Sequence, residues 1–364
     1  MHGNSRHVAA ALLLLTTFLA LPAGAMAQVR IEDPDRALSL TIGGWVQPRY
    51  ELTLRDEAEN LSSFYLRRVR LDVRGSVFSP AITFRVMPEF ARTAAMRDAW
   101  VNYEFSRAIQ VRFGQFQLPF QWHRQISDHQ QHFVERGEPS ETFGFLDGRD
   151  IGAMVFGQNE ARTRAYSLGL FDGAGRNVQF SSSAGNVASL RVTAALLGTI
   201  PASETDFRRT ERLALALGAG LQAANRSDLR RWDLGRSPAG NARADWVAGT
   251  ADVSIRGYGA SLAADAYLRA VEPDDAAVAD YTGGGFMVST GYALVPERLE
   301  LVARYSLLRE DLDVPATEAA QWGAGLNVYH RGTDFVTRLQ YLHDTAVGAT
   351  ADTGRLILQV HLRF

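Results

Sequence analysis

Arginine is concentrated in one short stretch of the chain. Residues 63–75 read SFYLRRVRLDVRG, with four arginines in thirteen positions. A guanidinium carries a planar fork of N–H donors that binds carboxylates and phosphates through paired hydrogen bonds, so this stretch favours reversible binding of anions. The chain of 364 residues has 38 basic side chains, and all of them are arginine. Genomic base composition is one explanation of that bias, and selection for anion binding is the other.

The same stretch alternates with the period of two that is typical of a β-strand. One face carries Phe64, Leu66, Arg68, Arg70, Asp72 and Arg74, and the other carries Tyr65, Arg67, Val69, Leu71 and Val73. Because a guanidinium buried without a partner costs several kcal/mol, the first face is expected to point into water. The second face is expected to contact lipid, with the long side chain of Arg67 reaching the headgroups.

The chain as a whole is predicted to be an all-β transmembrane antiparallel barrel. Apolar and polar residues alternate in segments of about ten residues, the last of which, RLILQVHLRF, ends at Phe364. We predict sixteen strands, an even number as single-chain bacterial barrels require, and a barrel of that size encloses an aqueous channel. The predicted strands span residues 38–53, 63–78, 81–90, 96–105, 108–118, 149–157, 163–172, 186–198, 211–223, 244–256, 257–270, 281–293, 297–309, 319–330, 333–344 and 353–364.

The ends of the chain indicate export. Residues 1–27 have a polar start with one arginine, an apolar run and an A-x-A pattern, which predicts a secretory signal peptide and leaves residues 28–364 as the mature barrel domain. There is no cysteine, so the exported chain relies on no disulfide. The terminal Phe364 resembles the signal by which bacterial outer-membrane barrels are handed to their assembly machinery. The expected location is the bacterial outer membrane, reached through the periplasm, with lipid and lipopolysaccharide around the barrel.

The connection over residues 119–148 is the longest, and we predict that it folds into the channel as the third extracellular loop and constricts it. It contains His123, Arg124, His129 and His132. Three histidines within ten residues are enough to suggest a transition metal, but their spacing matches no closed site. We therefore expect a polar constriction, with no metal ion and no other cofactor, in which partly protonated histidines tune anion passage near neutral pH.

Five motifs carry a family resemblance: FYLRRVRLDVRG (64–75), DAWVNY (98–103), VRFGQFQLPF (111–120), FVER (133–136) and GRDIGAMVFG (148–157). In this order they closely resemble the phosphate-selective porin O and P family. The resemblance implies a sixteen-stranded outer-membrane porin, usually trimeric, with arginines along the pore wall that pass phosphate or related anions. Arg68 and Arg70 take that role here, with Arg74 at the edge of the motif. The absence of lysine departs from the family pattern, in which lysines line the vestibule.

Strand parity adds Arg85, Arg112 and Arg304 to the predicted anion pathway. It also points other arginines inward, namely Arg49, Arg191, Arg256, Arg269, Arg338 and Arg355. A single β-bulge would reverse a face. The same parity points six acids inward, and these oppose an anion preference: Asp72, Glu89, Asp98, Glu104, Asp265 and Glu300. The predicted mature chain has 37 basic and 40 acidic residues, a formal charge of −3.

Three classes of function stay open at this point. A passive anion channel is the leading hypothesis, because the family motif and the inward arginines both favour it. A general or sugar-selective diffusion porin is the alternative, and aromatic residues stacked along the pore would favour it. A membrane-embedded hydrolase needs a strand-borne serine beside a histidine, and neither His343 nor His361 has one by parity. Nothing in the sequence indicates binding of nucleic acid.

Overall fold

The computed structural model describes residues 28–33, 37–55, 58–144, 148–178, 185–228, 243–346 and 352–364. The predicted signal peptide, residues 1–27, lies outside these ranges. Within them, no helix is both long enough and apolar enough to cross a bilayer. The strands are β1 (Val29–Asp33), β2 (Leu38–Arg55), β3 (Leu61–Val77), β4 (Ser79–Glu89), β5 (Ala95–Ser106), β6 (Ile109–Gln117), β7 (Arg149–Gln158), β8 (Arg164–Phe171), β9 (Val187–Leu197), β10 (Ala214–Asp228), β11 (Arg243–Gly257), β12 (Ala260–Pro273), β13 (Tyr281–Val295), β14 (Leu299–Arg309), β15 (Glu318–Arg331), β16 (Phe335–Ala346) and β17 (Thr353–Arg363).

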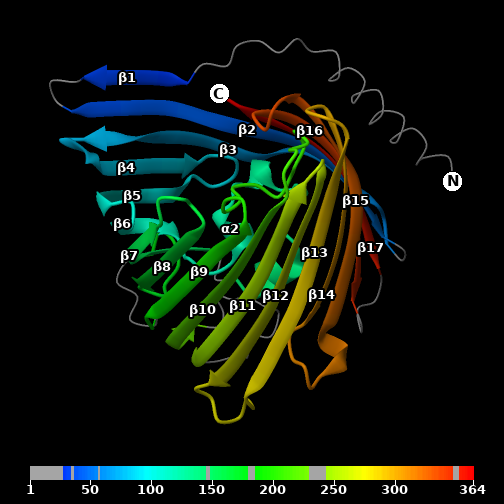
Figure 1. Cartoon of the computed structure of the whole chain (residues 1–364). Helices are drawn as coiled ribbons and strands as arrows, with labels where there is room; N and C mark the ends of the chain where they lie inside the picture. The colour runs from blue at the N-terminus through cyan, green and yellow to red at the C-terminus, as the bar shows by residue number, and fades with distance from the viewer. Residues whose placement is uncertain are drawn as a thin grey trace.

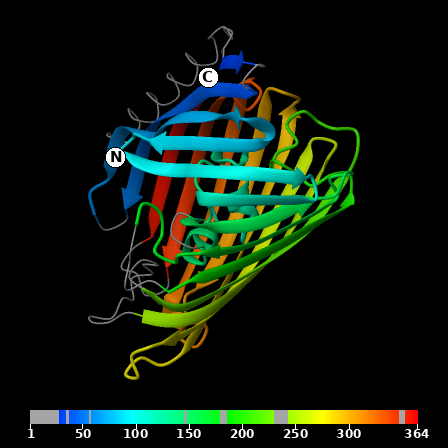
Figure 2. The same cartoon turned by 90° about the vertical axis from the view of Figure 1, so that its left-hand side faces the viewer.

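Strands β2 to β17 form a closed antiparallel barrel of sixteen strands (Figures 1 and 2). Each strand pairs with the next along the chain, and β17 pairs with β2 to complete the ring. At the seam, the backbone groups of Phe364 and Gly44 exchange two hydrogen bonds of 2.9 Å. Strand β1 pairs with β2 beyond this point, from Leu38 to Ile42. All sixteen predicted strands are therefore confirmed, and β1 is an additional strand that we did not predict.

The barrel is polar inside and apolar outside. Along β14, Glu300 and Arg304 point inward and are 0% and 6% exposed, whereas Leu301 and Tyr305 point outward and are 47% and 44% exposed. This arrangement is the reverse of a soluble protein, and it is the one that a bilayer around a polar interior requires.

Strand β3 departs from the predicted alternation at Arg67. Gln47 of β2 pairs with Arg68, but Pro48 pairs with Leu66, so Arg67 is an extra residue in a β-bulge. Pro48 has no N–H to donate to the ladder, and prolines in sheets are found at such bulges. Arg67 therefore contacts the barrel interior, while Leu66 and the preceding Phe64 are 46% and 72% exposed on the outside. The predicted faces of residues 64–67 were wrong for this reason.

Two connections fold into the barrel. The first, here called the inner loop, comprises residues 118–144 between β6 and β7; its short helices lie inside the ring in Figures 1 and 2. The second, here called the long turn, comprises residues 198–213 between β9 and β10. The inner-loop helices are α2 (Trp122–Gln125), η2 (Asp128–Gln130) and α3 (Glu138–Thr142).

The inner loop packs against the barrel wall through apolar side chains. Phe133 and Val134 form a buried cluster with Val302, Leu342 and Ile357. A second cluster joins Trp122 and Ile126 to Ala263, and a third joins Phe143 to Tyr267 and Leu308. Apolar side chains at several points along the loop are thus packed against the wall, which gives the loop one defined position.

Glycines on the wall allow this close approach. A Cβ atom at Gly220 of β10 would lie 2.5 Å from the carbonyl oxygen of Phe120, at the start of the inner loop. A Cβ atom at Gly291 of β13 would lie 2.8 Å from Nε2 of His132. Gly283, which belongs to a run of three glycines, leaves room for the ring of Phe143, 2.9 Å from its ideal Cβ position.

We predict that Gly220→Ala destabilises the barrel by about 1–3 kcal/mol, because the new methyl group collides with loop backbone. Gly249→Ala on the neighbouring strand is the control, since its Cβ would meet only Leu221, at 3.7 Å. Thermal unfolding in detergent, followed by circular dichroism, measures both. Equal midpoints for the two variants would show that the loop does not press on this part of the wall.

Candidate functional site in the barrel lumen

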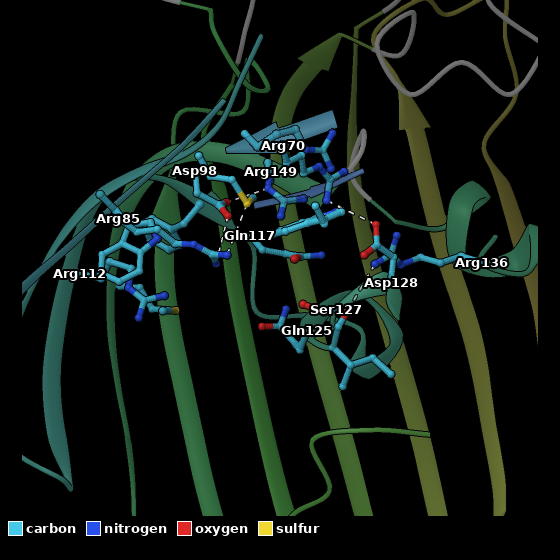
Figure 3. A pocket seen from close by; sticks show the side chains of 17 residues that line it. Arg70, Arg85, Asp98, Arg112, Gln117, Gln125, Ser127, Asp128, Arg136 and Arg149 are labelled. Atoms are coloured by element: carbon cyan, nitrogen blue, oxygen red, sulfur yellow. Dashed lines mark hydrogen bonds and ion pairs between the residues drawn. The ribbon is translucent and has the colours of Figure 1, made fainter. Parts of the chain in front are cut away.

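A polar cavity of about 180 Å³ lies between the inner loop and the wall from β2 to β7. Figure 3 shows Arg85 and Arg112 of the wall on one side, with Asp128 and Arg136 of the inner loop on the other. Six arginines line the cavity against two aspartates, which leaves a formal excess of four positive charges. The arginines are Arg70, Arg85, Arg97, Arg112, Arg136 and Arg149, and the aspartates are Asp98 and Asp128.

The arginines of β3 bind the inner loop. Arg70 lies 2.6 Å from Glu89 and 3.4 Å from Asp128, and Arg68 lies 2.7 Å from the same Asp128. Burial opposes ionisation of Asp128, but Arg68 and Arg70 outweigh it and hold the pKa of this carboxyl well below its usual range. Arg68 is 5% exposed beneath this contact and does not line the cavity.

A second ion-pair network joins β3, β4, β5 and β7. Arg85 contacts Asp72 at 2.6 Å and Asp98 at 3.5 Å, and Arg149 contacts Asp98 at 2.8 Å. Arg74 contacts the other side of Asp72, at 3.1 Å, and lies outside the cavity. The two carboxylates are thus shared among three arginines, and the network keeps a positive balance.

Arg112 of β6 has a different environment. Its guanidinium carbon lies 4.1 Å from the ring centre of Trp100 and 4.8 Å from that of Phe156, on the strands to either side. Among the described residues it has no hydrogen bond and no carboxylate within ion-pair distance, and its Nε is buried without a partner. The aromatic rings therefore hold the guanidinium by cation–π contact and leave its donors unused.

Arg136 is the inner loop's own contribution to the cavity. Its guanidinium donates to the backbone oxygens of His123, at 3.0 Å, and Ile126, at 3.5 Å, and the part of the chain that the structure describes gives it no carboxylate partner. Burial lowers the pKa of Arg136. At neutral pH the group stays charged, because an arginine pKa lies far above 7.

Other inward arginines hold the inner loop in place. Arg304 donates to the backbone oxygen of Glu135 at 2.7 Å, and Arg338 donates to that of His129 at 2.8 Å. Arg191 and Arg269 bind the backbone oxygens of Phe120 and Thr142. None of these four lines the cavity, so Arg304 does not share it with Arg85 and Arg112.

The side chain of Glu135 ties the loop to the opposite wall. Arg49 and Arg67 each approach it to 2.6 Å. Burial would raise the pKa of Glu135, but Arg68, Arg49 and the hydrogen bond from Arg67 lower it. Glu135 of the loop is thus bound by Arg49 of β2 and by Arg67, the extra residue in the bulge of β3.

The four residues predicted for the constriction lie inside the loop's own packing. His123 lies between Glu204 of the long turn, which it contacts, and Asp265 of β12, 2.6 Å away. His132 bonds Ser261 and Ser289 at 2.8 Å. Arg124 binds the backbone oxygen of Ser140 at 3.1 Å, and His129 stacks on His361 with ring centres 5.0 Å apart. In the described ranges no three histidine or acidic side chains are grouped to hold a metal ion.

Sequence reasoning missed Arg97, which lines the cavity beside Asp98. Met87 pairs with Asp98 but Pro88 pairs with Met96, so Arg97 is the extra residue of a bulge. The proline in the partner strand is the same signal as at Arg67. The role of Glu204 was also missed; the unusual length of its turn was the only hint.

Two residues of the family-like motifs, Asp150 and Gln115, act on a loop rather than on the lumen. Asp150 accepts a hydrogen bond of 2.6 Å from the backbone N–H of Gly173 and another from Ile151. Gln115 donates to the backbone oxygen of Met96 at 2.7 Å and accepts from the N–H of Asn177. Both side chains tether the connection that follows β8.

We predict a pH dependence from the His123–Glu204 contact. Burial lowers the pKa of a histidine, but Asp265 and Glu204 outweigh it and raise the pKa of His123 to about 10. For Glu204, burial is outweighed by His123, and its pKa falls to about 2. The ordinary pKa of histidine is 6.5, so the stability that His123 contributes is complete below pH 6.5 and is lost as the pH rises to about 10. The ordinary pKa of glutamate is 4.5, so the stability that Glu204 contributes is complete above pH 4.5 and is lost as the pH falls to about 2.

The difference in thermal unfolding midpoint between the wild type and His123→Gln should therefore be largest at about pH 4.5–6.5 and shrink toward pH 10. Circular dichroism of the detergent-solubilised barrel measures it. A difference that stays constant from pH 6 to pH 10 would contradict a charged imidazole at this position.

Comparisons with known proteins agree with this architecture. The structure is similar to the anion-selective porin from Comamonas acidovorans (TM-score 0.65, 14% identity, 90% of this chain and 100% of that chain). It is also similar to outer-membrane expressed OmpT of Vibrio cholerae (0.61, 12%, 93% and 100%) and to the outer membrane channel DcaP of Acinetobacter baumannii (0.59, 10%, 92% and 99%). At these identities the likeness shows the fold alone. No curated protein matches the sequence significantly.

The sequence also matches a family model over nearly its whole length. The match covers residues 21–363, and the family is described as phosphate-selective porin O and P. Together with the closed barrel and its polar interior, this match shows that the chain belongs to the phosphate-selective porin O and P family of outer-membrane porins.

Proposed function

We propose that this porin is a passive channel for small anions, with phosphate or related oxyanions among its solutes. The observation that carries the proposal is the excess of four positive charges around the cavity. Rings of arginine are what anion pores use, because a guanidinium replaces part of an anion's hydration shell. Arg70, Arg85 and Arg149 are each paired with a carboxylate. Arg112 and Arg136 have no carboxylate partner in the described residues, so these two are the strongest candidates for contact with a passing anion.

The inward acids do not cancel the arginines at the cavity. Asp72, Glu89 and Asp98 are each held by arginines at 2.6–2.8 Å, and the wall keeps more guanidinium groups than carboxylates there. Such pairs reduce the positive field without reversing it. This supports an anion channel over a general diffusion porin.

The aromatic residues of the cavity do not favour a sugar pathway. Trp45 lies 5.3 Å from the guanidinium of Arg70, and Trp100 lies 4.1 Å from that of Arg112. Arginines therefore occupy ring faces that a sugar would need for stacking. Family and fold point to a channel rather than to an enzyme.

The remaining sequence expectations form part of the same proposal. Residues 1–27 would be removed on export, leaving a mature protein from Gln28 onward. The assembly machinery would recognise Phe364 and insert the barrel into the outer membrane, among lipid and lipopolysaccharide. The barrels would associate as a homotrimer. Support comes from the family, and from the trimer form of OmpT of Vibrio cholerae, a structural neighbour at 13% identity and TM-score 0.58.

We predict an anion-selective zero-current potential for the mature protein in a planar bilayer under a KCl gradient. Added phosphate should reduce the chloride current, because it competes for the same guanidinium groups. A potential near zero, or of cation sign, without block by phosphate would replace the proposal with a general diffusion porin.

We further predict that Arg112→Gln lowers the chloride-to-potassium permeability ratio by about two- to fivefold, the effect of about 1 kcal/mol or less from one unpaired charge in a water-filled pore. Arg164→Gln is the matched control: it removes the same charge from an exposed position outside the cavity. The same zero-current measurement compares them. Equal shifts in both variants would mean that overall charge, rather than the cavity, sets selectivity.

A further inference from the structure

We propose that the long turn is a selectivity element, which together with the inner loop keeps two carboxylates of the barrel wall, Asp265 and Glu300, out of the ion path. The inference rests on the proposed anion channel and deepens it. It assigns a role to a connection that is longer than a hairpin needs and that lies away from the arginine cavity.

The two carboxylates differ from the inward acids at the cavity, which are paired with arginines: Asp265 faces the imidazole of His123, and Glu300 is bound by hydroxyl groups. Glu300 on β14 is 0% exposed and Asp265 on β12 is 3% exposed. In the described residues no arginine lies within ion-pair distance of either. An acid on a porin wall attracts cations when water reaches it. Their present burial therefore matters for the sign of the channel's field.

The long turn covers Glu300 directly. The hydroxyl of Thr205 donates to one carboxylate oxygen, and the hydroxyl of Tyr329 donates to the other at 2.6 Å. Phe207 of the turn stacks on Tyr329 with ring centres 4.4 Å apart. The turn thus supplies both a polar partner and an apolar cover, and Glu300 is sealed between the turn and the wall.

The turn covers Asp265 through the inner loop. Glu204 holds His123, whose other ring nitrogen lies 2.6 Å from Asp265, so that one imidazole joins turn, loop and wall. The loop backbone completes the joint: the N–H of His132 donates to Glu204 at 2.6 Å, and the N–H of Glu204 donates to the backbone oxygen of Gln130 at 3.0 Å.

Further bonds hold the turn in this place. Ser203 donates to the same Gln130 oxygen at 3.0 Å, and the indole of Trp122 donates to the backbone oxygen of Pro201 at 3.4 Å. Asp206 of the turn accepts a hydrogen bond of 2.8 Å from the N–H of Gly259, which lies between β11 and β12. Loop and turn therefore meet inside the barrel as one packed unit against β12–β15.

The consequence for charge is direct. The open cavity has six arginines and two aspartates, an excess of four. If Asp265 and Glu300 joined the same water-filled space, the excess would fall to two. The turn and the inner loop together thus keep two carboxylates away from a permeating ion.

The test replaces residues 198–214 by Asn-Gly, a two-residue turn suited to the paired residues Leu197 and Leu215. Zero-current potentials in a KCl gradient are measured for the wild type, the shortened barrel and the shortened barrel with Glu300→Gln. We expect the shortened barrel to gain potassium permeability relative to chloride by about twofold or more, from the field of the uncovered carboxylates. Glu300→Gln should return about half of that change, because Asp265 stays uncovered.

The matched control is Glu272→Gln in the shortened barrel, because Glu272 is an exposed carboxylate on the outward face of β12, the strand that carries Asp265. It should leave the shift in place. A full-length variant, Glu204→Gln with Thr205→Val, tests the same joint without removing chain, and should shift selectivity in the same direction by a smaller amount. Heat-modifiable migration on gels establishes that each barrel is folded.

Unchanged selectivity in both folded variants would overturn the inference, as would a shift that Glu300→Gln does not reduce. The wild-type measurement keeps the two proposals separate. A wild type without anion preference would contradict the proposed function. The role of the turn is judged separately, by the change in selectivity from wild type to variant and by the dependence of that change on Glu300.

Discussion

The closed ladder of backbone hydrogen bonds is the constraint on which the rest of this structure depends. In a bilayer no water is available for unpaired N–H and C=O groups, so the strands have to form a ring without an edge. The seam between β17 and β2, completed at Phe364 and Gly44, closes that ring. Once it is closed, every second side chain points to a protected polar interior. Arginines on strands such as β3 become tolerable there, because water, the inner loop and neighbouring acids solvate them.

Inside the ring, arginine serves two purposes. Arg304 and Arg338 use their donors on backbone oxygens of the inner loop, which would otherwise be buried without partners. Arg112 keeps its donors free, because its neighbours on β5 and β7 are aromatic rings that hold the guanidinium without using its N–H groups. The same residue type therefore fixes the loop on one side of the barrel and leaves a positive surface on the other, and the loop's position separates the two sets.

The strands could be predicted from the sequence because the period of two is a local pattern, visible in each segment by itself. The two errors of face on β3 and β5 have one cause: Arg67 and Arg97 are extra residues in bulges, opposite Pro48 and Pro88. A proline within a strand pattern is a readable signal of a bulge, and with it both arginines would have been placed inside. The inner loop and the long turn have no period, so their contacts with the wall left no comparable signal.

Alternation and the count of segments are properties of the chain alone, and for that reason a sixteen-strand barrel with arginines on its inner face could be predicted from the sequence. The tertiary structure decided which of those arginines stay available. Asp128 reaches Arg70 across 58 residues of chain, and Arg338 reaches the backbone oxygen of His129 across 209. Pairings of such separation depend on where the loop comes to rest in the closed barrel, and that position follows from packing inside the lumen rather than from any local pattern.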